Sequence, residues 1–196
     1  MFGAIRGKVK TWFTVGAGTL AAVTVAGLLG AFGALPQAQT PVLARDSQIE
    51  TGQWLVRPLR AYIGTDRVYD LPVKPDQQAL VLEVEMTNRT AESAKDYFTL
   101  FQLAPPLGGQ TEQPAVILTR DASMTPALHP GMTERMAYVW TFPKAVALPG
   151  ELPLVVNTKT YKPQDNLYGT PGWFNERELG SIEMPVEATK AAEGQS

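Results

Sequence analysis

The chain has 196 residues, no cysteine and one histidine, which excludes disulfides, thiol nucleophiles, thiolate zinc sites and any metal site built from several histidines. Its formal net charge is −2, but the three basic residues among the first 44 have no acidic counterpart, and the remainder carries 19 acidic against 14 basic residues. This mildly acidic remainder of about 150 residues is long enough for one hydrophobic core, and the lack of a basic run argues against nucleic acid as a partner.

An uncharged apolar segment, Phe13–Leu35, follows the short basic N-terminus of residues 1–12. As an α-helix it would be about 34 Å long, enough to cross a hydrocarbon core of about 30 Å. The cations Arg6, Lys8 and Lys10 place the N-terminus in the cytoplasm under the positive-inside rule. The sequence therefore predicts a single-pass anchor in the cell membrane, with the rest of the chain extracytoplasmic.

The same segment is open to a second interpretation, a cleaved signal peptide. Residues Val42–Ala44 offer the small or aliphatic side chains that signal peptidase requires, and cleavage after Ala44 would release a secreted domain. The apolar run is longer than the ~7–15 residues of a typical signal core, which favours the uncleaved anchor. Both interpretations place the following domain outside the cytoplasm.

Small residues recur along one side of the expected transmembrane helix. Such a stripe would let a second transmembrane helix approach closely, although small residues are common throughout this segment. The residues of the stripe are Gly18, Ala22, Ala26, Gly30 and Ala34.

After the expected helix, residues 36–48 are polar, contain proline and lack periodicity, which predicts a short linker. Residues 49–187 then contain about seven short segments with strand-like alternation, separated by turns rich in glycine and proline. These segments are Gln53–Gly64, Leu80–Thr90, Tyr97–Leu103, Ala115–Arg120, Glu134–Phe142, Leu152–Tyr161 and Gly180–Glu187. They predict an all-β domain, an antiparallel β-sandwich, and residues 188–196 are expected to be a frayed tail.

Alternation assigns the two faces of the central segments. Leu80, Leu82, Val84 and Met86 are expected to face the core, as are Met136, Tyr138, Trp140 and Phe142. Glu83 and Glu85 fall on the opposite face, where alternating acidic residues indicate a solvated sheet surface. Pro58 interrupts the first segment and predicts an edge strand or a bulge.

Two segments resemble one known group of domains. LVLEVEMTNRT (Leu80–Thr90) is a strand that ends in asparagine, and LHPGMTERMAYVWTFP (Leu128–Pro143) is a Pro-Gly turn followed by a strand, an aromatic residue and proline. Both are similar to immunoglobulin-like accessory domains of Gram-positive lipoproteins and single-pass membrane proteins. TKTYKPQDNLYGTPGWFN (Thr158–Asn175) resembles uncharacterised actinobacterial membrane-anchored proteins. The resemblance implies an immunoglobulin-like sandwich and carries over no catalytic residue.

Several residues are candidates for a chemical site. His129 would be a general base, but no nucleophile motif accompanies it, and Pro130–Gly131 predicts a type II turn at this point. Glu83 and Glu85 lie about 7 Å apart on a strand, a separation that a glycosidase pair would allow. Asp165 and Asn166 could supply oxygen ligands to Ca²⁺, or could simply form a turn.

The segment Tyr161–Asn175, YKPQDNLYGTPGWFN, combines four aromatic side chains with two prolines and two glycines. The prolines and glycines exclude a continuous strand, so a structured loop is expected. Its aromatic side chains either cap the open end of the sandwich or form an interface, where Tyr and Trp are favoured anchors. A platform for carbohydrate is a special case of the second arrangement. The candidate partner- or ligand-binding residues are Tyr161, Asp165, Asn166, Tyr168, Trp173 and Phe174.

The sequence thus predicts a membrane-anchored, non-enzymatic interaction domain without a cofactor or metal. Its expected partner is another membrane or envelope protein, such as a transporter, to which it would be an accessory. The alternative is a secreted or anchored module that binds a sugar, a small molecule or Ca²⁺ through residues 161–175.

Overall fold

A computed structural model describes residues 40–109, 113–167 and 169–187. The expected transmembrane helix 13–35, its stripe of small residues and the expected tail 188–196 lie outside the described residues. Within the described ranges, no helix is long and apolar enough to cross a membrane.

The described chain consists of strands joined by turns and one 3-10 turn, η1 (Leu107–Gly109). The strands are β1 (Ile49–Glu50), β2 (Trp54–Gly64), β3 (Arg67–Val68), β4 (Leu71–Pro72), β5 (Gln77–Asn88), β6 (Phe101–Leu103), β7 (Ala115–Leu118), β8 (Thr133–Pro143), β9 (Glu151–Lys162) and β10 (Gly172–Glu187).

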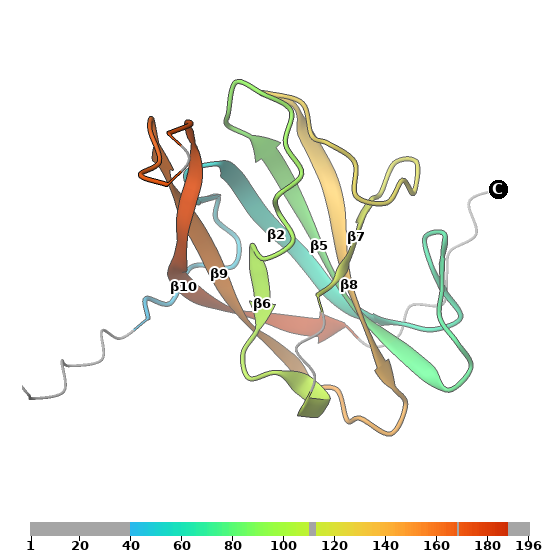
Figure 1. The fold of residues 1–196 in the computed structure, drawn as a ribbon. Helices are drawn as coiled ribbons and strands as arrows, with labels where there is room; N and C mark the ends of the chain where they lie inside the picture. Colours follow the sequence, from blue (N-terminus) through green and yellow to red (C-terminus); the bar gives the residue numbers. More distant parts are fainter. Residues whose placement is uncertain (1–39, 110–112, 168, 188–196) are drawn as a thin grey trace, which may run out of the picture. The chain divides into compact units, whose positions relative to one another are not determined.

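The strands form a β-sandwich whose two layers are joined by β10. The hydrogen-bonded order is β6-β9-β10-β2-β5-β8-β7, with β1 also paired to β2, and β3 and β4 form a separate hairpin. β10 runs antiparallel to β9 as far as Pro185 and then pairs in parallel with β2 through Val186 and Glu187. Figure 1 shows β2, β5, β8 and β7 in one layer and β6, β9 and β10 in the other. The prediction of an all-β sandwich is confirmed.

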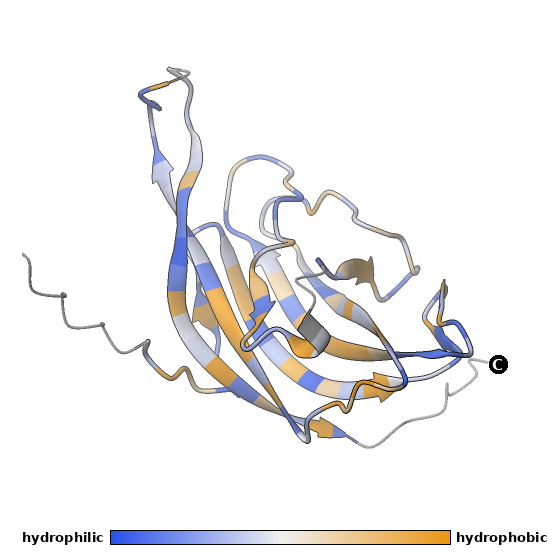
Figure 2. Cartoon of the chain, turned by 60° about the horizontal axis from the view of Figure 1, so that its bottom comes forward, coloured by the Kyte–Doolittle hydropathy of each residue, from blue (hydrophilic) through white to orange (hydrophobic). Residues whose placement is uncertain are grey.

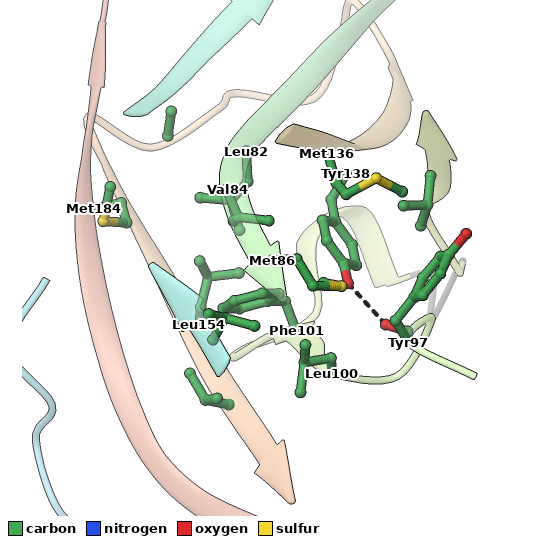
Figure 3. Packing of buried hydrophobic residues seen from close by; sticks show 14 of the residues in the cluster. Leu82, Val84, Met86, Tyr97, Leu100, Phe101, Met136, Tyr138, Leu154 and Met184 are labelled. Atoms are coloured by element: carbon green, nitrogen blue, oxygen red, sulfur yellow. Dashed lines mark hydrogen bonds between the residues drawn. The ribbon is translucent and has the colours of Figure 1, made fainter. Parts of the chain in front are cut away.

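The main hydrophobic core lies between these layers (Figure 3). The alternation of β5 and β8 is confirmed, because all eight side chains predicted to face inward are at most 3% exposed. Leu154 and Met184 contribute from the other layer. The buried hydroxyl of Tyr138 donates to the carbonyl oxygen of Tyr97 at 2.9 Å, so this polar group is satisfied inside the core.

Two predicted strands begin well away from the observed ones, at β6 and β10, and a third contains the predicted bulge. Tyr97–Thr99 are not strand, and β6 begins only at Phe101, because Tyr97 turns inward and donates its hydroxyl to the carbonyl of Pro126. Pro58 lies at a bulge of β2, as predicted, where the register shifts between Pro58 and Arg60. β10 begins at Gly172 rather than at residue 180, because its first half pairs with the end of β9.

Asn88, at the end of β5, fixes two connections with its side chain. It is completely buried, and its Nδ2 donates to the carbonyls of Glu92 and Leu128, both at 2.8 Å. Its Oδ1 accepts from the backbone N–H and the hydroxyl of Thr90. The side chain therefore makes four hydrogen bonds and ties β5 to the chain that precedes β8.

Residues expected in the linker are hydrogen bonded to the sandwich. The backbone of Leu43 donates to Ser181, and Ser181 donates to Pro41, at 2.7 and 2.8 Å. A Cβ on Gly180 would lie only 2.6 Å from Leu43 Cγ and 2.7 Å from the carbonyl oxygen of Pro41. The missing side chain of Gly180 is therefore what allows this segment to lie against β10.

Candidate functional site

The ends of β9 and β10 form a two-stranded arm, which we define as residues 158–177. Tyr161 pairs with Trp173 across the arm, and Thr160 pairs with Phe174. Figure 1 shows the arm as the orange-red hairpin at the upper left, and Figure 2 shows it extending beyond the neighbouring strand ends. The expected loop 161–175 is therefore only partly a loop, because β9 and β10 remain paired up to Lys162 and Gly172. The turn between them is flanked by Pro163 and Pro171.

The turn of the arm is organised by Asp165. Its backbone N–H donates to the carbonyl of Thr170, its carbonyl accepts from the N–H of Gly169, and its carboxylate accepts from the N–H of Leu167. Asp165 therefore stabilises a turn, which is one of the two roles that the sequence allowed; the other was calcium binding. The neighbouring Asn166 is exposed. The described residues contain no group of three or more metal-ligating side chains.

The aromatic side chains of the arm differ in their exposure. The rings of Tyr161 and Trp173 lie 5.5 Å apart, and Lys162 Nζ lies 5.7 Å from the ring of Phe174. Tyr161 is 51% exposed and Leu167, at the tip, is 78% exposed, so neither of these two side chains caps the sandwich. Trp173 and Phe174 are half-buried, and the ring of Trp173 lies against the backbone at Gly52. Tyr168 lies outside the described residues.

Both outer edges of the arm carry unpaired backbone. β6 pairs with β9 only at Leu154–Val156, and β2 reaches β10 only at Val186–Glu187. Along residues 158–162 and 172–177, no other described strand is hydrogen bonded to the outer edges. Unpaired strand edges are templates on which another chain can add a strand.

A small polar pocket lies at the base of the arm. It is lined by Thr51, Gln53, Trp54, Asp96, Thr99, Leu100, Asn157, Thr158, Lys159 and Glu176. Its cavity volume is about 10 Å³, room for one group the size of a water molecule. Sequence reasoning missed this pocket, because its residues come from four separate segments that share no motif.

The charged groups of the pocket are one ammonium, that of Lys159, and two carboxylates, those of Asp96 and Glu176. Lys159 Nζ lies 3.3 Å from Asp96 Oδ2 and 3.8 Å from Glu176 Oε2. The hydroxyl of Thr99 donates to Glu176, which lies in the register shift of β10 between Phe174 and Arg177.

Two polar atoms among the pocket residues have no hydrogen-bond partner. They are Gln53 Oε1 and Trp54 Nε1, and no other buried side-chain nitrogen or oxygen in the described ranges lacks one. Gln53 is 4% exposed and Trp54 is 2% exposed. Because Gln53 Nε2 donates to Asp96 Oδ1 at 2.6 Å, its orientation is fixed and Oε1 remains the free acceptor.

Glu83 departs from the solvated face that alternation predicted. The β3–β4 hairpin covers part of that face and forms a second small core with Val81, so Glu83 is only 8% exposed. Arg60 lies opposite it on β2 and donates twice to its carboxylate, each at 2.9 Å. The hydroxyl of Tyr69 donates to it at 2.6 Å. Glu85 remains at the surface, paired with Arg57.

The carboxylate of Glu83 is held in its charged form. Burial by itself would raise the pKa of Glu83, but the hydrogen bonds from Arg60 and Tyr69 outweigh this effect and lower it. Burial and the charge of Glu83 raise the pKa of the nearby Tyr62 to about 12. This set of groups fastens the β3–β4 hairpin to the sheet.

This arrangement predicts an acid-sensitive contribution to stability. Because the pKa of Glu83 is lowered by folding, its contribution is complete above the pKa of an unfolded glutamate, about 4.3, and is lost as the pH falls through the lowered value. We expect the free energy of unfolding to fall more steeply from about pH 5 to about pH 2 in the parent protein than in Glu83→Gln. Urea titrations at several pH values measure both slopes, and equal slopes would contradict the assignment.

His129 lies in the predicted type II turn, which is confirmed by the positive φ of 70° at Gly131 and by the bond from the N–H of Met132 to the carbonyl of His129. Its Nδ1 lies 2.9 Å from the hydroxyl of Ser93. Both side chains are exposed, and no carboxylate of the described residues is hydrogen bonded to the imidazole.

The chain matches no protein family model, and no curated protein matches it. Among solved structures, it is similar to an uncharacterised β-sandwich protein from Clostridium difficile 630. The two share 9% sequence identity over 77% of this chain and 98% of that chain, with a TM-score of 0.46.

Proposed function

We propose that this protein is a non-enzymatic, membrane-anchored extracytoplasmic domain that binds a partner protein through its arm. The observation that carries the proposal is a projecting two-stranded arm with exposed apolar side chains and unpaired outer edges. Such an arm can bind an extended segment of a partner, with main-chain hydrogen bonds for affinity and the aromatic side chains as anchors.

The finer fold assignment is also a proposal, namely that the sandwich is immunoglobulin-like. The order β7-β8-β5-β2 in one layer and β10-β9-β6 in the other corresponds to the strands D-E-B-A and G-F-C of that fold. On this correspondence the arm is the F–G hairpin, which belongs to the binding end of immunoglobulin variable domains. This supports the placement of a binding surface at the arm.

The anchor and the partner class rest on the sequence. The uncharged segment Phe13–Leu35, with three preceding cations, supports a single-pass anchor with an extracytoplasmic domain. A tethered domain meets proteins of the same membrane at high effective concentration. The proposed partner is therefore a membrane or envelope protein, such as a transporter, to which this protein is an accessory.

The test is capture of the full-length protein from its own membranes in mild detergent, followed by quantitative mass spectrometry. The parent protein should retain a membrane protein at constant stoichiometry, and Trp173→Ala with Phe174→Ala should reduce its recovery at least tenfold. Met124 and Met132 are 57% and 49% exposed and lie outside the arm, so changing both to Ala is the matched control and should leave recovery unchanged.

Equal recovery with both double variants would overturn docking through the arm. Recovery of a second copy of this chain alone, in a differentially tagged co-expression, would replace the heterologous partner by self-association.

A further inference from the structure

We propose that residues 40–43, which we call the strap, are a permanent part of the sandwich, and that the chain is therefore not cleaved after Ala44. The sequence left two forms open, an anchored protein and a secreted domain that begins at Arg45. The inference rests on the contacts between the strap and β10. It does not depend on what the arm binds, so it can fail while partner binding stands, and the reverse.

The strap lies along β10 as a short additional strand (Figure 1). Val42 pairs in parallel with Ser181. The N–H of Leu43 donates to the carbonyl of Ser181 at 2.7 Å, and the N–H of Ser181 donates to the carbonyl of Pro41 at 2.8 Å. Both backbone polar groups of Ser181 are therefore paired with the strap, and removal of residues 40–43 would leave this part of β10 as an open edge.

The two central side chains of the strap differ in exposure, as in a strand with one buried face. Val42 is 83% exposed. Leu43 is half-buried and packs against the main hydrophobic core. Thr40, at the start of the strap, donates its hydroxyl to the carboxylate of Glu178 at 3.3 Å. The strap therefore contributes an apolar contact with the core as well as main-chain hydrogen bonds.

Gly180 shows that β10 is adapted to the strap. This residue is buried, and its φ lies outside the left-handed region, so its backbone conformation alone does not require glycine. A Cβ at this position would lie 2.6 Å from Leu43 Cγ and 2.7 Å from the carbonyl oxygen of Pro41. Any larger residue would therefore push the strap away from β10, and room for the strap is the reason for glycine here.

The strap overlaps the candidate recognition site of signal peptidase, residues 42–44. Cleavage after Ala44 would remove Leu43 from the core, uncover Gly180 and unpair Ser181. Tolerance of a chain to truncation depends on the burial and hydrogen bonding of the backbone that is removed, and the strap has both. In the folded protein, a protease would bind the residues around this bond only after the strap leaves β10. We therefore expect the mature protein to retain the strap.

The first measurement is the N-terminal residue of the mature protein. The full-length chain with a C-terminal tag is produced in its own host and recovered separately from the membranes and from the medium. Intact mass and N-terminal peptide mapping then identify each form. We expect every recovered form to retain residues 40–43. A mature form that begins at any residue after Thr40, such as Arg45, would overturn the proposal.

Limited trypsin digestion of the full-length protein measures how firmly the strap is held. Trypsin cleaves after Arg45, whose side chain is 54% exposed, but the neighbouring strap must first detach. We expect Leu43→Ser to accelerate this cleavage about tenfold, because proteolysis follows the population of the open form. Val42→Ser is the matched control, since it changes the adjacent exposed side chain and should be cleaved like the parent protein.

Gly180→Val disturbs the same contact from the side of β10 and should also accelerate cleavage after Arg45. Its control is Gly150→Val, because a Cβ on Gly150 meets no atom within 4 Å. Near-UV circular dichroism reports whether each variant keeps the folded sandwich, and Leu43→Ser decides the question if Gly180→Val does not fold. Unchanged cleavage in a folded Leu43→Ser or Gly180→Val variant, or equal acceleration in Val42→Ser, would overturn the proposal.

Discussion

Replacement of Asn88 by alanine is expected to lower the free energy of unfolding by about 3 kcal/mol. The change removes four hydrogen bonds at a completely buried position, leaves the N–H of Thr90 without its partner and takes from the carbonyl of Leu128 one of its two donors, the other being the N–H of Ala94. Alanine is too small to offer new contacts in place of these hydrogen bonds. The loss of stability is therefore the free energy of burying polar groups without their partners. Urea denaturation followed by tryptophan fluorescence measures the effect.

Two further variants separate the hydrogen bonds of Asn88 from its bulk. Asn88→Asp keeps the volume but places a carboxylate oxygen against the two carbonyls that now accept from Nδ2, and should destabilise at least as much as alanine. Thr87→Ala, one residue earlier on β5, loses only a hydroxyl contact with Thr133 and should cost less than about 0.5 kcal/mol. A small effect of both changes at Asn88 would show that this side chain does not tie β5 to the segment before β8.

Replacement of Glu83 by glutamine is expected to cost about 2 kcal/mol at neutral pH. The amide cannot accept both hydrogen bonds of the guanidinium, and the charge that compensates Arg60 is lost. Breaking a buried ion pair usually costs more, about 3–5 kcal/mol, but Arg60 keeps 40% of its side chain exposed and water can solvate it.

The matched control is Glu85→Gln, on the same strand and the same face. Glu85 accepts from Arg57 and lies 3.6 Å from Arg135, and the two arginine side chains are 44% and 67% exposed. Surface pairs of this kind contribute little, so about 0.5 kcal/mol is expected. Equal losses in the two variants would mean that the β3–β4 hairpin does not shield Glu83 from water in solution.

The residues of the arm show how far local sequence reasoning reaches. Pro163, Pro171 and Gly169 predicted a turn, and the turn lies there, because these residues restrict the backbone whatever surrounds them. The sequence did not indicate that Tyr161 and Trp173 are partners across two strands. That pairing depends on the register between β9 and β10, which no pattern within a single segment specifies.

The amino-acid sequence by itself determined most of the long strands β2, β5, β8 and β9, and which side of β5 and β8 faces the core. A period of two in hydrophobicity is a property of neighbouring residues, so it can be read without knowledge of the fold. The turn at His129 was determined in the same way, by local backbone preferences, whereas at Asp165 the sequence left calcium binding open beside a turn.

Only the tertiary structure decided the surroundings of Glu83 and the existence of the polar pocket. Glu83 and Glu85 are equivalent in the alternation. In the folded protein, however, the β3–β4 hairpin covers the sheet face at Glu83, whereas Glu85 stays partly exposed. The pocket brings together Gln53, Asp96 and Lys159, which the chain keeps far apart in sequence. Burial and charge at such positions are set by long-range packing, and their chemistry therefore appears only once the layers are assembled.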